Sequence, residues 1–353
     1  MPAPSQPSLH DQLHVRLEEK LRRELGTAVL DALADPRIIE VMLNPDGRLW
    51  LDELGVGMRD TGTIVSAAQA ENLLGTIAAT LGTIVNADHP ILEGELALDG
   101  SRVCGLLSPV VRAPAFCIRK AASAVYTLDD YVRDGILDVA ASFGVSDLLD
   151  APPYGHAATL RHAIATRQNI LVVGGTQSGK TTLTNGLLHE LACSVGDEQR
   201  VVVLEETREL RCTVGNHVAL RSTETIDLTR LVRTAMRLRP DRIIVGEVRG
   251  AEALAMLKAW NTGHPGGIAT VHANDAHAAL IRLEQLVQEA NVPAQPALIA
   301  EAVDLIVVIV RTPTGRRITE VARVRGVRDN TYLLDPIEPA PDDGARLRGG
   351  VAA

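Results

Sequence analysis

Aromatic residues are nearly absent from this sequence. Phe, Tyr and Trp together make up 2% of its 353 residues, although 46% of the residues are hydrophobic. The cores must therefore be built from Ala, Val, Leu and Ile, a composition that suits α/β domains. The chain is long enough for two such domains. Few aromatic rings also argue against a channel for single-stranded nucleic acid, because such channels stack bases on them.

Cysteine motifs and membrane-spanning runs are missing as well. The four cysteines include no C-x-x-C pair, which argues against structural zinc and favours free thiols in a reducing compartment. The N-terminal MPAPSQPSLHDQLH has no apolar core, so it does not resemble a signal peptide. The most apolar stretch, residues 296–310, is too short to span a bilayer and contains Glu301 and Asp304. We therefore predict a cytoplasmic protein with, at most, peripheral membrane contact.

The chain also has no excess of basic residues. Its 35 Lys and Arg residues are outnumbered by 44 Asp and Glu residues, which leaves a net charge of −9. Nucleic acid is bound largely through its phosphates, and an acidic chain is poorly suited to them. Direct binding of nucleic acid is therefore not expected.

Periodicity divides the chain into two folded domains. Apolar residues recur at helical spacing in 13–34 and in 67–81. Short strand-like runs surround turn residues such as Asn44-Pro45-Asp46-Gly47 and recur, split by Gly and Pro, in 91–120. The first domain is therefore predicted to be α+β. The predicted boundaries are a disordered N-terminus at 1–12, an N-terminal domain at 13–122, a linker at 123–140, a second domain at 141–337 and a disordered tail at 338–353.

The second half alternates strands with helices. The strand-like runs are NILVVGG, RVVVLEE, RIIVGE, GIATVHA and DLIVVIV. Helices are predicted between them at 180–192, 228–238, 251–260 and 276–290. This alternation implies parallel strands joined by crossover helices, the α/β class. The polar stretch KAASAVYTLDDYVRDG before this half is interpreted as the linker.

A phosphate-binding loop lies at the first of these strand–helix junctions. Lys180 is expected to reach the β- and γ-phosphates of a nucleotide, and the Thr181 hydroxyl to ligate Mg²⁺. Backbone N–H groups of the loop and the start of the helix surround such phosphates. A nucleoside triphosphate is therefore the expected ligand, with Thr182 at the end of the contact set. The residues that match G-x-x-x-x-G-K-[ST] are Gly174, Gly175, Thr176, Gln177, Ser178, Gly179, Lys180 and Thr181.

Acidic residues follow two of the other predicted strands. VVVLEETREL ends its strand in Glu205 and Glu206, and RIIVGEVRG places Glu247 just beyond its strand. The carboxyl ends of parallel strands line the ligand crevice, so these acids are expected beside the phosphate loop. A triphosphatase needs a metal carboxylate and a group that orients water at that place. Gly246, where a metal-binding aspartate is usual, is expected to leave space beside the loop.

Histidines and arginines supply further candidates. TGHPGGIATVHAND places His272 at a strand end in the same crevice, where γ-phosphate sensing and a structural role are about equally supported. His264, in the preceding loop, is interpreted as structural. Arg230, Arg233 and Arg237 recur opposite the apolar face of a predicted helix. Two interpretations of this arginine face stay open, a solvated surface and a subunit contact.

Four blocks of the sequence together resemble one family. They are GGTQSGKTT, LEETREL, RLRPDRIIVGEVRG and TGHPGGIATVHAND. In this order and spacing they resemble the secretion-superfamily ATPases, in particular the conjugal-transfer ATPases of type IV secretion systems (the Trb type). The segments IIEVMLNPDGRLWLD, ILEGELALDGSRVCGLLSPVV, FCIRK and YTLDDYV resemble the N-terminal domain of that family. The resemblance covers residues 25–335.

The resemblance implies an architecture and a machine. It implies a RecA-like P-loop ATPase domain at the C-terminal end, a PAS-like N-terminal domain and a homo-oligomeric, hexameric ring. ATP and Mg²⁺ would be bound between the two domains. The ring would act at the inner membrane with secretion-channel and coupling proteins, in a type IV secretion or mating-pair-formation apparatus.

The same resemblance assigns roles to single residues. Glu247 would position and activate the attacking water, and His272 would sense the γ-phosphate. Arg102 and Arg119 would reach the phosphates from the N-terminal domain. The pair Glu205-Glu206 would form an acidic box that supports the metal together with the Thr181 hydroxyl. The family usually has Glu-Asp in this box, so the longer second side chain departs from its pattern.

Three other functions compete with this interpretation. Within the superfamily, a Flp-type or twitching pilus motor is the runner-up, and neighbouring genes would separate it from a conjugal ATPase. A RecA-like DNA motor predicts a basic pore or stacking aromatic residues, which the composition does not support. A nucleotide-gated scaffold with negligible hydrolysis is disfavoured by the intact Lys180, Thr181 and Glu247.

Overall fold

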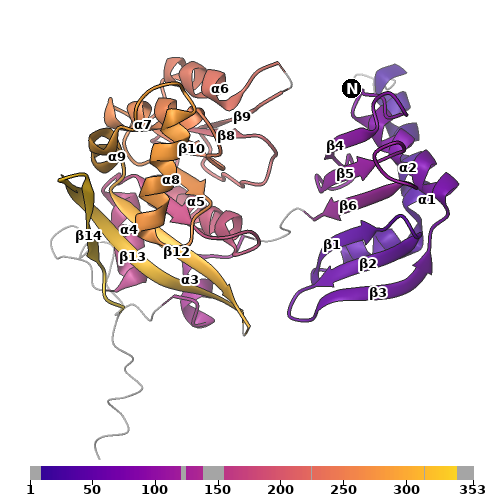
Figure 1. The fold of residues 1–353 in the computed structure, drawn as a ribbon, viewed down its shortest axis with the longest axis horizontal. Helices are drawn as coiled ribbons and strands as arrows, with labels where there is room; N and C mark the ends of the chain where they lie inside the picture. Colours follow the sequence, from indigo (N-terminus) through magenta and orange to yellow (C-terminus); the bar gives the residue numbers. More distant parts are fainter. Residues whose placement is uncertain (1–8, 121–124, 138–154, 224, 314, 340–353) are drawn as a thin grey trace, which may run out of the picture. The chain divides into compact units, whose positions relative to one another are not determined.

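Two structural units make up the chain (Figure 1). They comprise Met1–Ser123 and Ala124–Ala353, and each has a hydrophobic core of its own. The computed structural model describes residues 9–120, 125–137, 155–223, 225–313 and 315–339. Within these ranges no helix is both long enough and apolar enough to cross a bilayer.

The first unit is a six-stranded antiparallel sheet with two helices. The strand order is β3-β2-β1-β6-β5-β4. Helix α2 begins at a capping box in which Ser66 and Gln69 satisfy each other's backbone N–H groups. The elements are α1 (Leu9–Ala34), β1 (Ile38–Leu43), β2 (Arg48–Glu53), β3 (Gly57–Ile64), α2 (Ala67–Thr80), β4 (Ile91–Glu95), β5 (Arg102–Leu106) and β6 (Ala115–Arg119).

The first sheet has one covered face and one open face. Val41, Ile118 and Val103 are paired across β1, β6 and β5 and are buried in the core that α1 and α2 complete. Figure 1 shows both helices on one side of this sheet. Successive side chains in a strand point to opposite faces, so Arg119 and Arg102 lie on the other, open face. This unit is α+β, as predicted.

The second unit is built around an eight-stranded sheet with the order β14-β13-β12-β7-β11-β10-β8-β9. The strands from β12 to β9 run parallel, and β13 and β14 add an antiparallel edge. The elements are α3 (Leu128–Arg133), α4 (His156–Ala165), β7 (Ile170–Val173), α5 (Lys180–Val195), β8 (Val201–Glu205), β9 (His217–Arg221), α6 (Leu228–Ala235), the 3₁₀ segment η2 (Met236–Leu238), β10 (Arg242–Val245), α7 (Glu252–Asn261), β11 (Ile268–Val271), α8 (Ala276–Gln288), α9 (Pro296–Ala302), β12 (Leu305–Thr312), β13 (Gly315–Arg328) and β14 (Thr331–Pro336).

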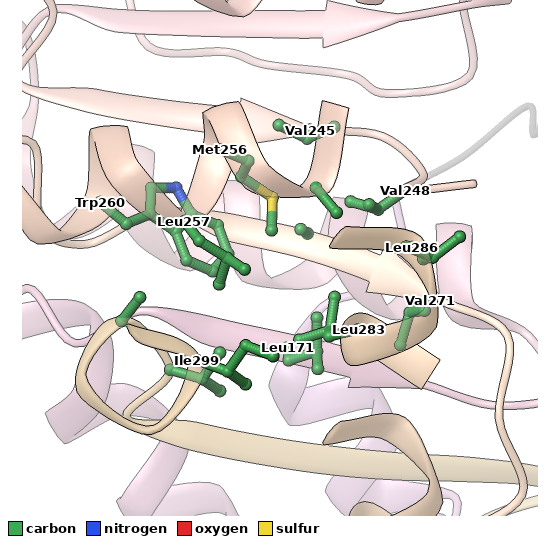
Figure 2. Close-up of a cluster of buried hydrophobic side chains, with 14 of the residues drawn as sticks. Leu171, Val245, Val248, Met256, Leu257, Trp260, Val271, Leu283, Leu286 and Ile299 are labelled. Atoms are coloured by element: carbon green, nitrogen blue, oxygen red, sulfur yellow. The ribbon is translucent and has the colours of Figure 1, made fainter. Parts of the chain in front are cut away.

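Helices cover both faces of the central strands. Every residue of β7, β10 and β11 is buried, which explains why these strands are almost entirely apolar, with Arg242 of β10 and Thr270 of β11 as the polar residues. Leu171, Val245 and Val271 face the core formed with α6 to α9 (Figure 2). The alternate residues Ile170 and Ile244 face a second core formed with α3, α4 and α5. The alternating strands and helices of the sequence thus give the predicted α/β architecture.

The entrance to β11 is tightly packed. The Trp260 indole of α7 lies in the core of Figure 2, and its Nε1 donates to the Ile243 carbonyl at 3.1 Å. Gly267 passes directly beside this indole. A Cβ at Gly267 would lie 2.0 Å from Trp260 Nε1, so only glycine fits there.

The range predicted as a linker, 123–140, contains the folded helix α3. Thr127 and Asp130 form its capping box, and Leu128 and Tyr131 are buried in the core shared with α5. These two apolar residues stand three positions apart among acidic neighbours, so the local composition looks like that of a solvated linker. The interpretation was therefore wrong for residues 125–137.

The other differences concern the ends of elements and strands that were not predicted. Residues 9–12 were predicted to be disordered, but helix α1 begins at Leu9. The helix predicted at 228–238 becomes the 3₁₀ segment η2 after Ala235. The strands β3, β9, β13 and β14 have no counterpart among the predictions. The predictions for residues 1–8, 138–154 and 340–353 fall outside the described residues.

Candidate active site

The phosphate loop connects β7 to α5, in the predicted strand–loop–helix context. Lys180 is only 8% exposed, and its Nζ donates to the carbonyl oxygens of Gly174 at 3.0 Å and Gly175 at 2.9 Å. A buried ammonium group needs such acceptors. The lysine is therefore held inside the loop, where the phosphates of a nucleotide would bind.

The residues of the loop fit an anionic ligand. Gly179, the N-cap of α5, offers no side-chain acceptor to the first turn of the helix. The Ser178 Oγ is buried and has no hydrogen-bond partner among the described residues. An unpaired hydroxyl and a helix N-terminus suit phosphate oxygens. Gln177 is braced from far away in the sequence, since Arg311 donates to its Oε1 at 2.9 Å.

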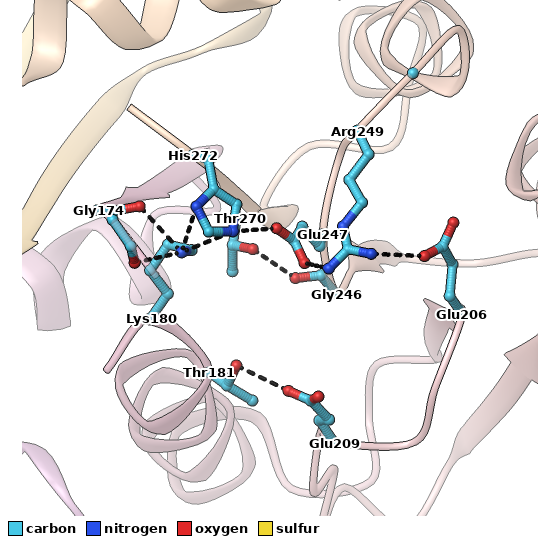
Figure 3. Close-up of polar contacts among 12 residues, drawn as sticks. Gly174, Lys180, Thr181, Glu206, Glu209, Gly246, Glu247, Arg249, Thr270 and His272 are labelled. Atoms are coloured by element: carbon cyan, nitrogen blue, oxygen red, sulfur yellow. Dashed lines mark hydrogen bonds and ion pairs between the residues drawn. The ribbon is translucent and has the colours of Figure 1, made fainter. Parts of the chain in front are cut away.

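Thr181, the predicted magnesium ligand, contacts a carboxylate that was not predicted as a site residue. Its Oγ1 donates to Glu209 Oε2 at 3.1 Å (Figure 3). Asn185 Nδ2 donates to the Glu209 carbonyl at 3.1 Å. Glu205 Oε1 in turn accepts the backbone N–H of Glu209 at 2.9 Å and of Leu210 at 2.8 Å. Glu205 thus shapes the loop that carries Glu209. The sequence signal for Glu209 was its place in LEETREL.

Gly246 allows a close approach between two strand ends. A Cβ there would lie 3.0 Å from Glu205 Cγ, and the Gly246 N–H donates to the Leu204 carbonyl at 2.8 Å. The space that Gly246 leaves is therefore taken by Glu205, rather than lying beside the phosphate loop as predicted.

Glu247 lies at the centre of a contact chain. Its Oε1 lies 2.6 Å from His272 Nε2, and its Oε2 accepts a bond from Arg249 Nη2 at 2.5 Å. Lys180 Nζ lies 3.3 Å from His272 Nε2 and 3.4 Å from Nδ1. Arg249 Nη1 also donates to Glu206 Oε2 at 3.2 Å. Figure 3 shows this chain running from the loop lysine to the end of β8.

The electrostatics of this chain favour a neutral histidine. Burial lowers the pKa of His272, and the neighbouring Lys180 charge lowers it further, while Glu247 raises it less. The ring thus lies between the Lys180 ammonium group and Glu247 Oε1, within 3.4 Å of the first and 2.6 Å of the second. The hydrogen bond to Glu247 raises the pKa of Arg249, so this side chain stays cationic. His272 is therefore placed to connect the loop lysine with Glu247.

No ready-made carboxylate cage for a metal exists in the described residues. No group of three or more His, Cys, Asp or Glu side chains there is arranged to hold an ion. Glu205 serves backbone N–H groups and Glu206 contacts Arg249. Mg²⁺ is usually held by one or two protein groups together with substrate phosphates. Thr181 fits that arrangement, and the ligand roles of Glu205 and Glu206 remain predictions.

The predicted arginines of the first unit lie side by side. Arg102 on β5 and Arg119 on β6 are direct partners across the sheet, and Arg119 Nε lies 3.5 Å from Glu40 Oε1. Glu95 and Glu40 flank the two arginines in the same register row. The structure thus brings the arginines together on one open face. Their contact with phosphates remains a prediction.

Two further predictions concern residues away from the loop. His264 Nδ1 lies 3.0 Å from the Pro240 carbonyl, a structural contact as predicted. Arg230, Arg233 and Arg237 are exposed along α6 and η2, opposite its buried residues. This exposure fits both interpretations of the arginine face, so its role remains open.

Comparison with known proteins identifies the family. The family model for type II/IV secretion system proteins matches residues 146–331. A probable conjugal transfer protein TrbB of Sinorhizobium fredii is 48% identical over 322 residues, covering 91% of this chain and 94% of that protein. The chain belongs to the type II/IV secretion system family. In this family, the conjugal transfer protein TrbB of Rhizobium radiobacter is 46% identical over 330 residues, covering 94% of this chain and 97% of that protein.

A solved ATPase structure shares the fold of this family member. The Legionella pneumophila ATPase DotB matches with a TM-score of 0.56 and 18% identity, covering 92% of this chain and 83% of that one. At this identity the likeness concerns the fold alone. The resemblance drawn from the four sequence blocks is thereby confirmed, as is the predicted class, a RecA-like P-loop domain with an α+β, PAS-like N-terminal domain.

Proposed function

We propose that this secretion-family protein hydrolyses ATP to power a type IV secretion machine of the conjugal-transfer type. The observation that carries the proposal is the contact chain in which Lys180, His272 and Glu247 meet. These residues follow three neighbouring strands, β7, β11 and β10, and a triphosphatase needs its phosphate cation and water-orienting group at such a place. The relatives named as conjugal transfer proteins support the biological role.

Each residue of the site has a defined task in hydrolysis. Lys180 exchanges its loop carbonyls for the β- and γ-phosphates when ATP binds, which frees His272 to respond to the γ-phosphate. Glu247 then orients water for in-line attack and accepts its proton. The loop from Gly174 to Thr182, helped by the α5 N-terminus, binds the phosphates.

The Thr181 hydroxyl would hold Mg²⁺, with Glu205, Glu206 and Glu209 as the nearby acids, and the ion would supply positive charge to the phosphates. Arg102 and Arg119 add cations from the N-terminal unit. If these two arginines bind the γ-phosphate, its release removes their ligand, which makes them a ligand-dependent switch.

The proposal includes an assembly and a location. Six copies form a homo-oligomeric ring, cytoplasmic and peripheral at the inner membrane, where it contacts secretion-channel and coupling proteins. The pilus-motor alternative is less well supported, because relatives at 46% and 48% identity are conjugal transfer proteins. A DNA motor would instead show ATP hydrolysis stimulated by DNA.

The test is phosphate release by the purified full chain with ATP, with and without Mg²⁺. We expect Mg²⁺-dependent turnover in the wild type. In Glu247→Gln, turnover should fall about 10²- to 10³-fold, because the amide cannot take the proton, while binding of a fluorescent ATP analogue is kept. Wild-type levels of phosphate release by this variant would contradict the role of Glu247. Absence of turnover in the wild type would support the nucleotide-gated scaffold instead.

A further inference from the structure

Arg249 bridges two carboxylates that follow different strands. Its guanidinium contacts Glu247 through Nη2 at 2.5 Å and Glu206 through Nη1 at 3.2 Å (Figure 3). Glu247 follows β10 and Glu206 follows the neighbouring strand β8. We propose that Arg249 is a positioning residue that holds Glu247 in its working orientation, and that Glu206 anchors Arg249. The inference rests on the proposed ATP hydrolysis.

The backbone places Arg249 beside Glu247. Val248, between them, is buried in the core, and its N–H donates to the Thr270 carbonyl of β11 at 2.9 Å. The Thr270 hydroxyl also donates to the Gly246 carbonyl at 2.7 Å. Because the side chain of Val248 points into the core, those of Glu247 and Arg249 turn to the other side, toward the site, where they meet.

A buried acid fixes the root of the Arg249 side chain. Glu252 Oε1 accepts the backbone N–H of Arg249 at 2.6 Å and of Gly250 at 2.8 Å, and Glu252 itself is 8% exposed. The Cα of Arg249 is therefore held at the start of α7. A guanidinium whose backbone is fixed can orient a carboxylate. A guanidinium on a mobile loop would orient it less well.

The two oxygens of the Glu247 carboxylate have different contacts. Arg249 holds Oε2, while Oε1 faces His272 and hence the phosphate loop. A carboxylate held at one oxygen by a charge-assisted bond keeps the other in a defined direction. That second oxygen is the one available to water when His272 turns to the phosphate.

Glu206 has contacts that suit an anchor better than a metal ligand. It contacts Arg249, whereas the hydroxyl of Thr181 donates to Glu209. The guanidinium also relieves repulsion between Glu206 and Glu247, two acids at neighbouring strand ends. The Arg249 and Glu206 side chains are 49% and 48% exposed, so the pair adds little to stability, and its effect belongs in the rate.

The test measures phosphate release by the full chain across ATP and Mg²⁺ concentrations. The variants are Arg249→Gln, Arg249→Lys, Glu206→Gln and the double glutamine variant. Arg328→Gln, at an exposed arginine that ends β13, is the matched control. We expect Arg249→Gln to lower kcat about 10- to 100-fold with KM for ATP within about twofold, because Glu247 is misplaced while binding is intact.

The other variants separate a bridge from a simple charge. Arg249→Lys should recover little, because an ammonium group lacks the planar fork that holds two carboxylates. Glu206→Gln should lower kcat about 3- to 10-fold, and the double variant should be no slower than Arg249→Gln, since both changes break one unit. The control should match the wild type.

Three results would overturn the inference: wild-type kcat in Arg249→Gln, independent multiplication of the two effects, or a raised Mg²⁺ requirement in Glu206→Gln as its only defect. The last would make Glu206 a metal ligand. If the wild type releases no phosphate, the proposed function fails. The inference rests on turnover and then fails with it, whereas turnover in the wild type with an unchanged kcat in Arg249→Gln contradicts the inference alone.

Discussion

Arg119 and Arg242 are both arginines in strands, but they differ in burial, because one lies in the first sheet and the other in the second. Arg119 ends β6 on the open face of the first sheet, and its side chain is 40% exposed. Arg242 begins β10 inside the second sheet and is 1% exposed. It donates to Gln199 Oε1 at 2.7 Å, to the Ile164 carbonyl at 2.8 Å and to the Gly266 carbonyl at 3.3 Å.

The difference shows where each sheet can hold functional groups. A sheet with one open face can present polar side chains in rows across its strands, as Arg102 and Arg119 do. In a sheet covered on both faces, a polar side chain must find its partners inside. Burial lowers the pKa of Arg242 to about 10, a cost that its hydrogen bonds offset. Functional groups of the second sheet therefore follow the strands, as Glu247 and His272 do.

The largest effect is expected for Lys180, in the phosphate loop that follows β7 of the second sheet. Lys180→Ala should reduce turnover about 10²- to 10³-fold, because it removes the cation closest to the developing charge. It also leaves the Gly174 and Gly175 carbonyls without their donor. Phosphate release checks the rate, and circular dichroism checks that the fold persists. Turnover within tenfold of the wild type would contradict the assignment.

The next effect concerns stability inside the same sheet. Arg242→Ala should lower the free energy of unfolding by about 3 kcal/mol or more, because it leaves a cavity and two buried carbonyls without donors. Urea denaturation of the full chain measures this change. Arg237→Ala, at an exposed position of η2, is the matched control and should change stability by less than about 0.5 kcal/mol. Equal urea midpoints for both variants would contradict the view that the buried contacts of Arg242 stabilise the second sheet.

On the open face of the first sheet, a substitution should change turnover more than it changes stability. Arg119→Ala should change the free energy of unfolding by less than about 1 kcal/mol, because its ion pair with Glu40 is partly exposed. If Arg119 reaches the phosphates, turnover should still fall about tenfold or more. Paired measurements of phosphate release and urea midpoint are needed. A large loss of stability with unchanged specific activity would refute the phosphate role.

The smallest effect is a pH dependence of stability from His272. Its pKa in the folded chain lies below the ordinary value of 6.5, so between these two values the unfolded chain binds more protons. Stability should therefore fall as the pH falls through this window, and His272→Gln should lack that part of the slope. Because the His272 side chain is 43% exposed, the difference should be small. Urea midpoints between about pH 7.5 and pH 5 measure it, and identical slopes would exclude it.

Local patterns were sufficient for much of the fold and for the phosphate loop. The buried runs around Ile243 and Leu171 could be recognised as strands, because both faces of these strands are covered. Lys180 and Thr181 could be recognised because phosphate binding depends on one contiguous segment. Helix α3 was missed because only Leu128 and Tyr131 of its six residues are buried.

Contacts between distant segments could not be predicted in this way. The bond from Arg311 to Gln177 spans 134 positions, and Arg249 reaches Glu206 across 43 positions. Nothing local to Glu206 distinguishes an acid that meets a metal from one that meets an arginine. The hydrogen bond from Thr181 to Glu209 likewise depends on a distant contact, because Glu205 accepts the backbone N–H of Glu209 and so fixes the loop.

Gly267 has a consequence for genetics. It lies five residues before His272 and donates its N–H to Asn169 Oδ1 at 2.9 Å, yet any side chain there would collide with Trp260. Such a collision would displace β11, the strand that delivers His272. In a screen for lost transfer, changes at Gly267 would therefore be recovered together with changes at His272. Protein abundance in the recovered clones would separate the two groups, since only the glycine changes should deplete the folded chain.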